Sequence, residues 1–97
     1  MAQSNFEAEA RLIVSRNLTT NVAGAAASFD AFAGHLDVTY FLFGPSTDDD
    51  EELRELSVGE LIAAFPAIKT ASSGFEPLSE MEKAGSHLIL ARDQTSD

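Results

Sequence analysis

The sequence contains no cysteine and no tryptophan. A chain without cysteine forms no disulfide, no thiolate metal site and no cysteine nucleophile. Small secreted domains often depend on disulfides, so their absence favours the cytoplasm. The first residues lack the basic start and apolar run of a signal peptide, and no apolar stretch has the length of a membrane span. We therefore expect a cytoplasmic protein.

Basic residues are also scarce. Lysine and arginine together number 6 against 16 acidic residues, which gives a formal net charge of -10 at pH 7. A protein with this charge is repelled by nucleic-acid phosphates and by anionic lipid surfaces, so we expect neither as a partner. The natural electrostatic complement is a basic protein. The alternative is that the charge only keeps the protein soluble.

The length of 97 residues suits one domain built around one hydrophobic core. Hydrophobic residues make up 44% of the chain, which is close to the average for globular proteins. We predict a single domain over residues 1–97, with an ordered core over residues 5–92 and a polar tail at 93–97.

Two segments carry the spacing of apolar residues that is typical of amphipathic helices. They predict one helix over residues 5–17 and another over residues 47–65. Either Thr47-x-x-Asp50 or Ser46-x-x-Asp49 approximates a capping box at the start of the second helix. The apolar faces consist of Phe6, Ala10, Ile13 and Val14 in the first helix, and of Leu53, Val58, Leu61, Ile62, Ala64 and Phe65 in the second.

Alternating polar and apolar residues predict two strands, at residues 28–32 and 35–43, which form a hairpin around Ala33-Gly34. The apolar face of the second strand consists of Leu36, Val38, Tyr40 and Leu42. The remaining predicted elements are a strand at 67–72, a loop at 73–77 and a final strand at 86–92. The order α-β-β-α-β-β predicts an α+β two-layer sandwich, with two helices packed on a mainly antiparallel sheet.

The acidic run from Asp48 to Glu52 has the composition of a metal site but not its spacing. A calcium-binding loop needs glycine at its sixth position and glutamate at its twelfth. Counted from Asp48, these positions hold Leu53 and Gly59. We therefore predict no metal at this run and no cofactor, and we expect its charge to stabilise the first turn of a helix.

His35 and His87 are the only histidines, and each lies at the start of a predicted strand. No serine lies in a nucleophile elbow, and the sequence has neither a dinucleotide-binding fingerprint nor a phosphate-binding loop. We therefore predict that the protein is not an enzyme. The alternative is a small enzyme, or an accessory subunit of one, that uses His35 or His87 with nearby carboxylates.

An ordered set of segments resembles a known family. The segments are Arg16, Tyr40–Gly44, Ser46–Glu52, Glu60–Pro66, Pro77-Leu78 and Leu88–Arg92. The chain is similar in this respect to small bacterial proteins found in polymorphic-toxin and contact-dependent-inhibition neighbourhoods, some of which act as immunity proteins. The most specific match is Glu60-Leu61-Ile62-Ala63-Ala64-Phe65-Pro66. The chain departs from the pattern at residues 22–27 and 29–32 and in its aliphatic last strand.

The resemblance implies a protein-binding module whose acidic surface blocks a basic toxin domain, commonly a nuclease, by steric and electrostatic means. We expect the acidic run to project five carboxylates into solvent, and Glu60 to lie at the rim of the apolar stripe or within the interface. The predicted partner-binding residues are Asp48, Asp49, Asp50, Glu51, Glu52 and Glu60. A third interpretation is that the chain is a soluble domain whose sequence indicates nothing beyond its fold. The oligomeric state is left open.

Overall fold

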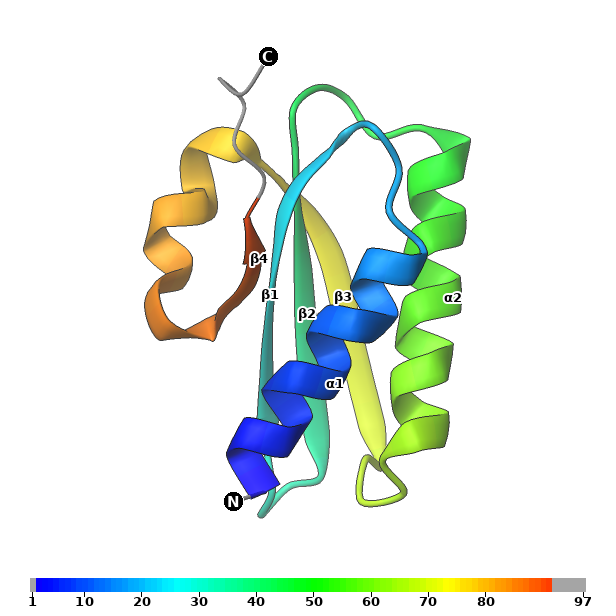
Figure 1. Ribbon diagram of the computed structural model, residues 1–97, viewed down its shortest axis with the longest axis vertical. Helices are drawn as coiled ribbons and strands as arrows, with labels where there is room; N and C mark the ends of the chain where they lie inside the picture. The colour runs from blue at the N-terminus through cyan, green and yellow to red at the C-terminus, as the bar shows by residue number, and fades with distance from the viewer. Residues whose placement is uncertain (1, 92–97) are drawn as a thin grey trace.

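A computed structural model describes residues 2–91 of the chain (Figure 1). Its elements follow one another as α1 (Ala2–Arg16), β1 (Val22–Asp30), β2 (His35–Leu42), α2 (Asp48–Ala64), β3 (Thr70–Pro77), the 3₁₀-helical segment η1 (Leu78–His87) and β4 (Leu88–Ala91). The two α-helices pack on a four-stranded sheet, so the predicted α+β two-layer sandwich is confirmed. No helix in the part of the chain described here is long and apolar enough to cross a membrane.

The strands lie in the order β3-β2-β1-β4. The hairpin pairs β1 with β2 antiparallel, and β4 lies antiparallel to β1 on the other side. Only β2 and β3 are parallel. Parallel neighbours need a crossover connection, which α2 supplies between them. The prediction of a mainly antiparallel sheet is therefore confirmed.

The core lies between the helices and the inner face of the sheet. The predicted apolar face of the first helix is buried, as is the predicted apolar face of β2. In this core the ring of Phe6 lies against those of Phe29 and Phe65, with 5.9 and 5.3 Å between the ring centres, respectively. Both of these faces follow from periodicity within one segment, and both predictions are confirmed.

The inner face of α2 is narrower than its sequence suggests. Leu53 and Leu61 are buried as predicted, but Ile62 is 42% exposed. The buried hydroxyl of Ser57 lies in this face, where it donates to the carbonyl oxygen of Leu53 at 2.7 Å and is hydrogen-bonded to the hydroxyl of Tyr40. Burial, partly offset by the Ser57 bond and by Arg54, raises the pKa of Tyr40.

β1 is the strand with the weakest signal in the sequence, yet its residues from Val22 to Ala27 are all buried. Small side chains suit this central strand because it is covered on both faces. A Cβ on Gly24 would lie 2.5 Å from the carbonyl oxygen of Leu90 and 2.5 Å from the sulfur of Met81. Gly24 therefore allows β4 and η1 to approach β1 more closely than any side chain permits.

The C-terminal third differs from the prediction. β3 runs through the predicted loop to Pro77, because it pairs residue by residue with β2 from His35↔Thr70 to Leu42↔Pro77. This long-range pairing overrides the turn preference of Ser73-Gly74. Residues 78–87 form η1, which was not predicted, and it shortens the last strand to Leu88–Ala91. The predicted polar tail at 93–97 lies outside the described residues.

A substitution at Gly59 tests whether the backbone of α2 is regularly helical at this position. It is exposed in the middle of α2, and a Cβ added there would meet no atom within 4 Å. Gly59→Ala is expected to raise the free energy of unfolding by about 0.5–1 kcal/mol, because alanine loses less backbone entropy in a helix. Urea denaturation measures the change.

Ala63→Gly is the matched control, since Ala63 is another exposed position of the same helix. It is expected to lower the free energy of unfolding by a similar amount. Equal stability of the Gly59→Ala variant and the parent chain would contradict a regular helix at this position.

Candidate partner-binding surface

α2 begins with a capping box built on Thr47. The hydroxyl oxygen of Thr47 accepts from the backbone N–H of Asp50 at 3.2 Å, and the carboxylate of Asp50 accepts from the backbone N–H of Thr47 at 2.9 Å. Of the two registers compatible with the sequence, the structure adopts the one from Thr47 to Asp50. The helix start is therefore held by its own side chains.

Asp50 also joins α2 to the segment between α1 and β1. Its carboxylate accepts from the Thr19 hydroxyl at 2.6 Å and from the Asn21 amide at 2.8 Å. Burial alone would raise the pKa of Asp50, but the hydrogen bonds from Asn21, Thr19 and Thr47 outweigh it and hold the pKa below its usual value. The carboxylate is thus kept charged inside the protein by its donors.

The expectation that all five carboxylates project into solvent is therefore wrong for Asp50, which is fully buried. Its oxygens are occupied by the cap and by the Thr19 and Asn21 side chains, so it has no free face for a partner. Sequence periodicity could have placed it on the buried side of the helix, since it lies three residues before the buried Leu53. Asp50 is a structural residue, and we remove it from the candidate surface.

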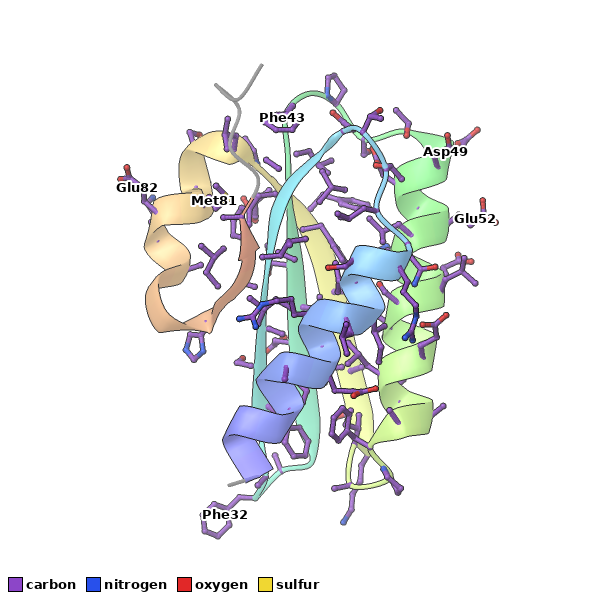
Figure 2. The ribbon with its side chains drawn as sticks, in the orientation of Figure 1. Phe32, Phe43, Asp49, Glu52, Met81 and Glu82 are labelled. Carbon is purple, nitrogen blue, oxygen red and sulfur yellow. The ribbon has the colours of Figure 1, made fainter. Side chains whose placement is uncertain are left out.

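Three carboxylates of the acidic run remain exposed, namely those of Asp48, Asp49 and Glu52. Figure 2 shows Asp49 and Glu52 pointing away from the domain on the outer side of α2. Among the described residues, none of the three is joined to a cation by a salt bridge. They form the candidate partner-binding surface, which we call the α2 acidic surface.

Glu51 is partly buried and already paired. Its carboxylate accepts from the guanidinium of Arg54 at 2.5 Å, one turn further along the helix. The Arg54 guanidinium in turn lies over the ring of Phe75 on β3, with 5.6 Å between its carbon and the ring centre. Glu51 therefore serves mainly to hold Arg54 against β3, at the edge of the α2 acidic surface.

Glu60 lies apart from the acidic run. It is twelve residues after Asp48, or about 18 Å along the helix axis. Its carboxylate accepts from the guanidinium of Arg16 on α1 at 3.1 Å, and the two side chains are 42% and 59% exposed, respectively. Glu60 is thus a solvated residue that bridges the two helices, and the structure does not bring it together with Asp49 and Glu52.

His35 lies in a polar cluster on the outer face of the sheet. Its Nδ1 is 2.7 Å from the Thr70 hydroxyl, and its Nε2 is 3.2 Å from the Ser72 hydroxyl and 3.4 Å from the Asp37 carboxylate. Ser72 also donates to Asp37. A catalytic triad needs the carboxylate on the ring nitrogen opposite the serine. Here Ser72 and Asp37 share Nε2, so Ser72 does not take the position of the serine, whereas the Thr70 hydroxyl lies on the opposite nitrogen from Asp37.

His87 belongs to a different feature, an open groove of about 260 Å³ between η1 and the outer face of the sheet. Lys83 and Glu80 also line the groove and are joined to each other at 2.9 Å. Because η1 was not predicted, this groove could not be located from the sequence. Within residues 2–91, no three histidine or acidic side chains gather into a group that could hold a metal ion.

The fold and this surface define a small two-layer α+β domain with a capped, acidic helix start. Comparison of the chain with protein-family models and with curated proteins finds no match.

Proposed function

We propose that this domain is a non-enzymatic binding module that blocks a basic protein, in the manner of an immunity protein that neutralises a toxin domain in the cytoplasm. The observation that supports it best is the α2 acidic surface, three exposed carboxylates without an intramolecular cation partner among the described residues. The resemblance of the sequence to immunity proteins supports the same function.

The proposed mechanism is steric and electrostatic. A nuclease binds the phosphates of its substrate through cationic side chains, and these are the groups that an acidic surface complements. A domain seated over them excludes the substrate without any chemical step. The net charge of -10 adds long-range attraction, which accelerates the encounter with a basic partner.

The setting of the α2 acidic surface favours binding as well. The capping box fixes the start of α2, and Asp50 ties it to Thr19 and Asn21. Carboxylates on a fixed backbone lose less conformational entropy on binding than carboxylates on a loop. The buried Asp50 thus holds in place the helix start that carries the α2 acidic surface.

The test compares association rates with the basic partner identified beside the gene or by pull-down from the host. The double variant Asp49→Asn/Glu52→Gln is expected to associate about ten-fold more slowly at low salt, because charge steering acts mainly on the association rate. The difference should shrink as ionic strength rises, since exposed charges are screened over about 10 Å at 0.1 M salt. Stopped-flow fluorescence measures the association rate of each variant and its dependence on ionic strength.

The matched control is Glu76→Gln/Glu82→Gln, which removes the same net charge from exposed positions outside α2 (Glu82 is labelled in Figure 2). We expect a smaller decrease in this variant. Equal decreases in the two variants would reduce the role of acidity to net charge alone. Unchanged rates in both would remove the acidic surface from the mechanism.

A further inference from the structure

β3 forms one edge of the sheet, and its outer side is open. It pairs only with β2, along all eight of its residues. This ladder contains no bulge, whereas both ladders of β1 contain a register shift. Proteins usually protect an exposed edge with a bulge, a proline or a lysine. Within β3 none of these occurs before Pro77, so the edge is suited to pairing with another strand.

The opposite edge of the sheet is shorter and already occupied. β4 has only four residues and follows η1 directly. The carbonyl oxygen of Ile89 in β4 accepts from the Nε of Arg11 on α1 at 2.7 Å. Of the two edges, β3 is therefore the one that offers a long run of backbone groups.

The backbone groups that β3 presents to its open side follow from one hydrogen bond. The N–H of Thr70 donates to the carbonyl oxygen of Gly34, directly before β2, at 3.1 Å. Because N–H groups alternate in direction along a strand, those of Ala71, Ser73 and Phe75 point away from β2. They are spaced by about 6.6 Å, twice the rise per residue, which matches the backbone of another extended chain. In the described part of the chain, no hydrogen bond outside the β2 ladder uses these three N–H groups.

α2 extends past this edge of the sheet. Figure 1 shows α2 beyond β3, on the side where the sheet ends. Arg54, Val58 and Ile62 are spaced four residues apart, so they share one side of the helix. The Arg54 guanidinium donates to the Ser73 hydroxyl at 3.4 Å and lies over the Phe75 ring, so this side faces β3. Ile62 is 42% exposed, which provides an apolar contact beside the position of an added strand.

A second copy of this chain does not fit this position. Two copies paired antiparallel through β3 are related by a two-fold axis perpendicular to the sheet, so both α2 helices lie on the same face. Each α2 extends past its own edge, so the two helices would overlap. Each copy also has a net charge of -10. An extended segment of another protein avoids the overlap, and lysine or arginine in that segment complements the charge.

We infer that β3 accepts an extended, basic segment of a partner protein as an additional strand of the sheet. The segment pairs with the main chain of Ala71, Ser73 and Phe75, and its apolar side chains at alternate positions lie beside Ile62 under α2. The positions between them carry lysine or arginine and lie on the other face, which the exposed Glu76 shares because it alternates with Phe75. This surface is separate from the α2 acidic surface.

Amide hydrogen exchange followed by NMR tests the inference. The probe is a synthetic peptide of alternating valine and lysine, with the length of β3 and with both ends blocked. In the free protein the N–H groups of Ala71, Ser73 and Phe75 should exchange faster than those of Ser72 and Gly74, which point to β2. When the peptide binds, exchange of the three outward groups should slow in proportion to the bound fraction.

Two further peptides separate strand pairing from simple charge attraction. A peptide that is N-methylated at every residue keeps the side chains and the charges but has no N–H to donate, and it should not protect the three groups. A peptide with glutamate in place of lysine should bind more weakly than the parent peptide at low salt, because it is repelled by the acidic protein.

Ser73→Pro removes the central outward N–H, which an edge strand tolerates. This variant should bind the valine–lysine peptide about ten-fold more weakly, the factor that corresponds to one backbone hydrogen bond. Ser73→Ala is the matched control, since it loses the same hydroxyl but keeps the N–H. If Ser73→Pro does not fold, Ile62→Lys replaces it. Its control is Leu56→Lys, at a 48% exposed position of α2 outside the stripe that faces β3.

The absence of protection at the three outward groups at millimolar peptide would overturn the inference. So would equal protection by the N-methylated peptide, or equal affinity of the edge variant and its control. The proposed function can fail or hold independently of these results, because its test changes Asp49 and Glu52 and measures association with an intact basic protein.

Discussion

Gly24→Ala is expected to lower the free energy of unfolding by about 3 kcal/mol, the upper end of the usual cost of overpacking a core. The added Cβ would lie 2.5 Å from both the Leu90 carbonyl oxygen and the Met81 sulfur. The Met81 side chain can turn away because it is flexible. The Leu90 carbonyl cannot, because it belongs to β4, which pairs with β1 beside Gly24.

Urea denaturation followed by circular dichroism measures this loss. Gly74→Ala is the matched control, because Gly74 lies in β3 and a Cβ there would meet no atom within 4 Å. The control should be as stable as the parent chain or slightly more stable. If Gly24→Ala unfolds at the same urea concentration as the parent, β4 and η1 do not pack on β1 as closely as described.

Asp50→Ala is expected to lower the free energy of unfolding by about 3–4 kcal/mol, which combines loss of a helix cap with loss of the acceptor of several partly buried donors. The substitution removes one acceptor from each of three donors, the Thr19 hydroxyl, the Asn21 amide and the backbone N–H of Thr47. A domain of this size is stabilised by only about 5–15 kcal/mol. The variant should therefore remain folded at neutral pH but unfold at much lower urea concentrations.

The pH dependence of the free energy of unfolding distinguishes the contribution of the charge of Asp50 from the contribution of its size and shape. Hydrogen bonding lowers the folded-state pKa of Asp50 below its ordinary value of 3.8. Its stabilisation is therefore fully present above that ordinary value and is lost as pH falls through the folded-state pKa. The stability difference between the parent chain and Asp50→Asn should be largest near neutral pH and should shrink in acid.

The matched control for this prediction is Asp48→Asn. Asp48 is the first residue of the same helix and is exposed. Its interaction with the helix end is worth only about 0.3–1 kcal/mol. Two results would mean that the buried network does not stabilise the charged carboxylate. One is a loss of stability in Asp48→Asn as large as that in Asp50→Asn. The other is a stability difference between Asp50→Asn and the parent chain that does not change with pH.

Several elements could be predicted because their signals lie within one short segment. The spacing of Phe6, Ala10 and Ile13 places one side of α1 in the core whatever it packs against, since helical periodicity is a local property. The alternation in β2 acts in the same way, and Thr47 and Asp50 cap α2 across only three residues. The α+β class followed from the order of these elements.

Other features could not be predicted because they depend on residues far apart in the chain. Ser73-Gly74 has the composition of a turn, but pairing with β2 makes it part of a strand. The candidate surface depended on such contacts as well. Thr19 and Asn21 hydrogen-bond the carboxylate of Asp50, whereas Arg16 forms a salt bridge with Glu60 between the two helices.

The sequence by itself determined the acidity of the protein, the absence of thiol chemistry, the apolar faces of α1 and β2 and the cap of α2. Each of these depends on composition or on neighbours a few residues apart. Only the tertiary structure decided which carboxylates of the acidic run reach solvent and that β1 must be built from small residues. Those outcomes depend on distances between segments that approach one another only when the core is packed.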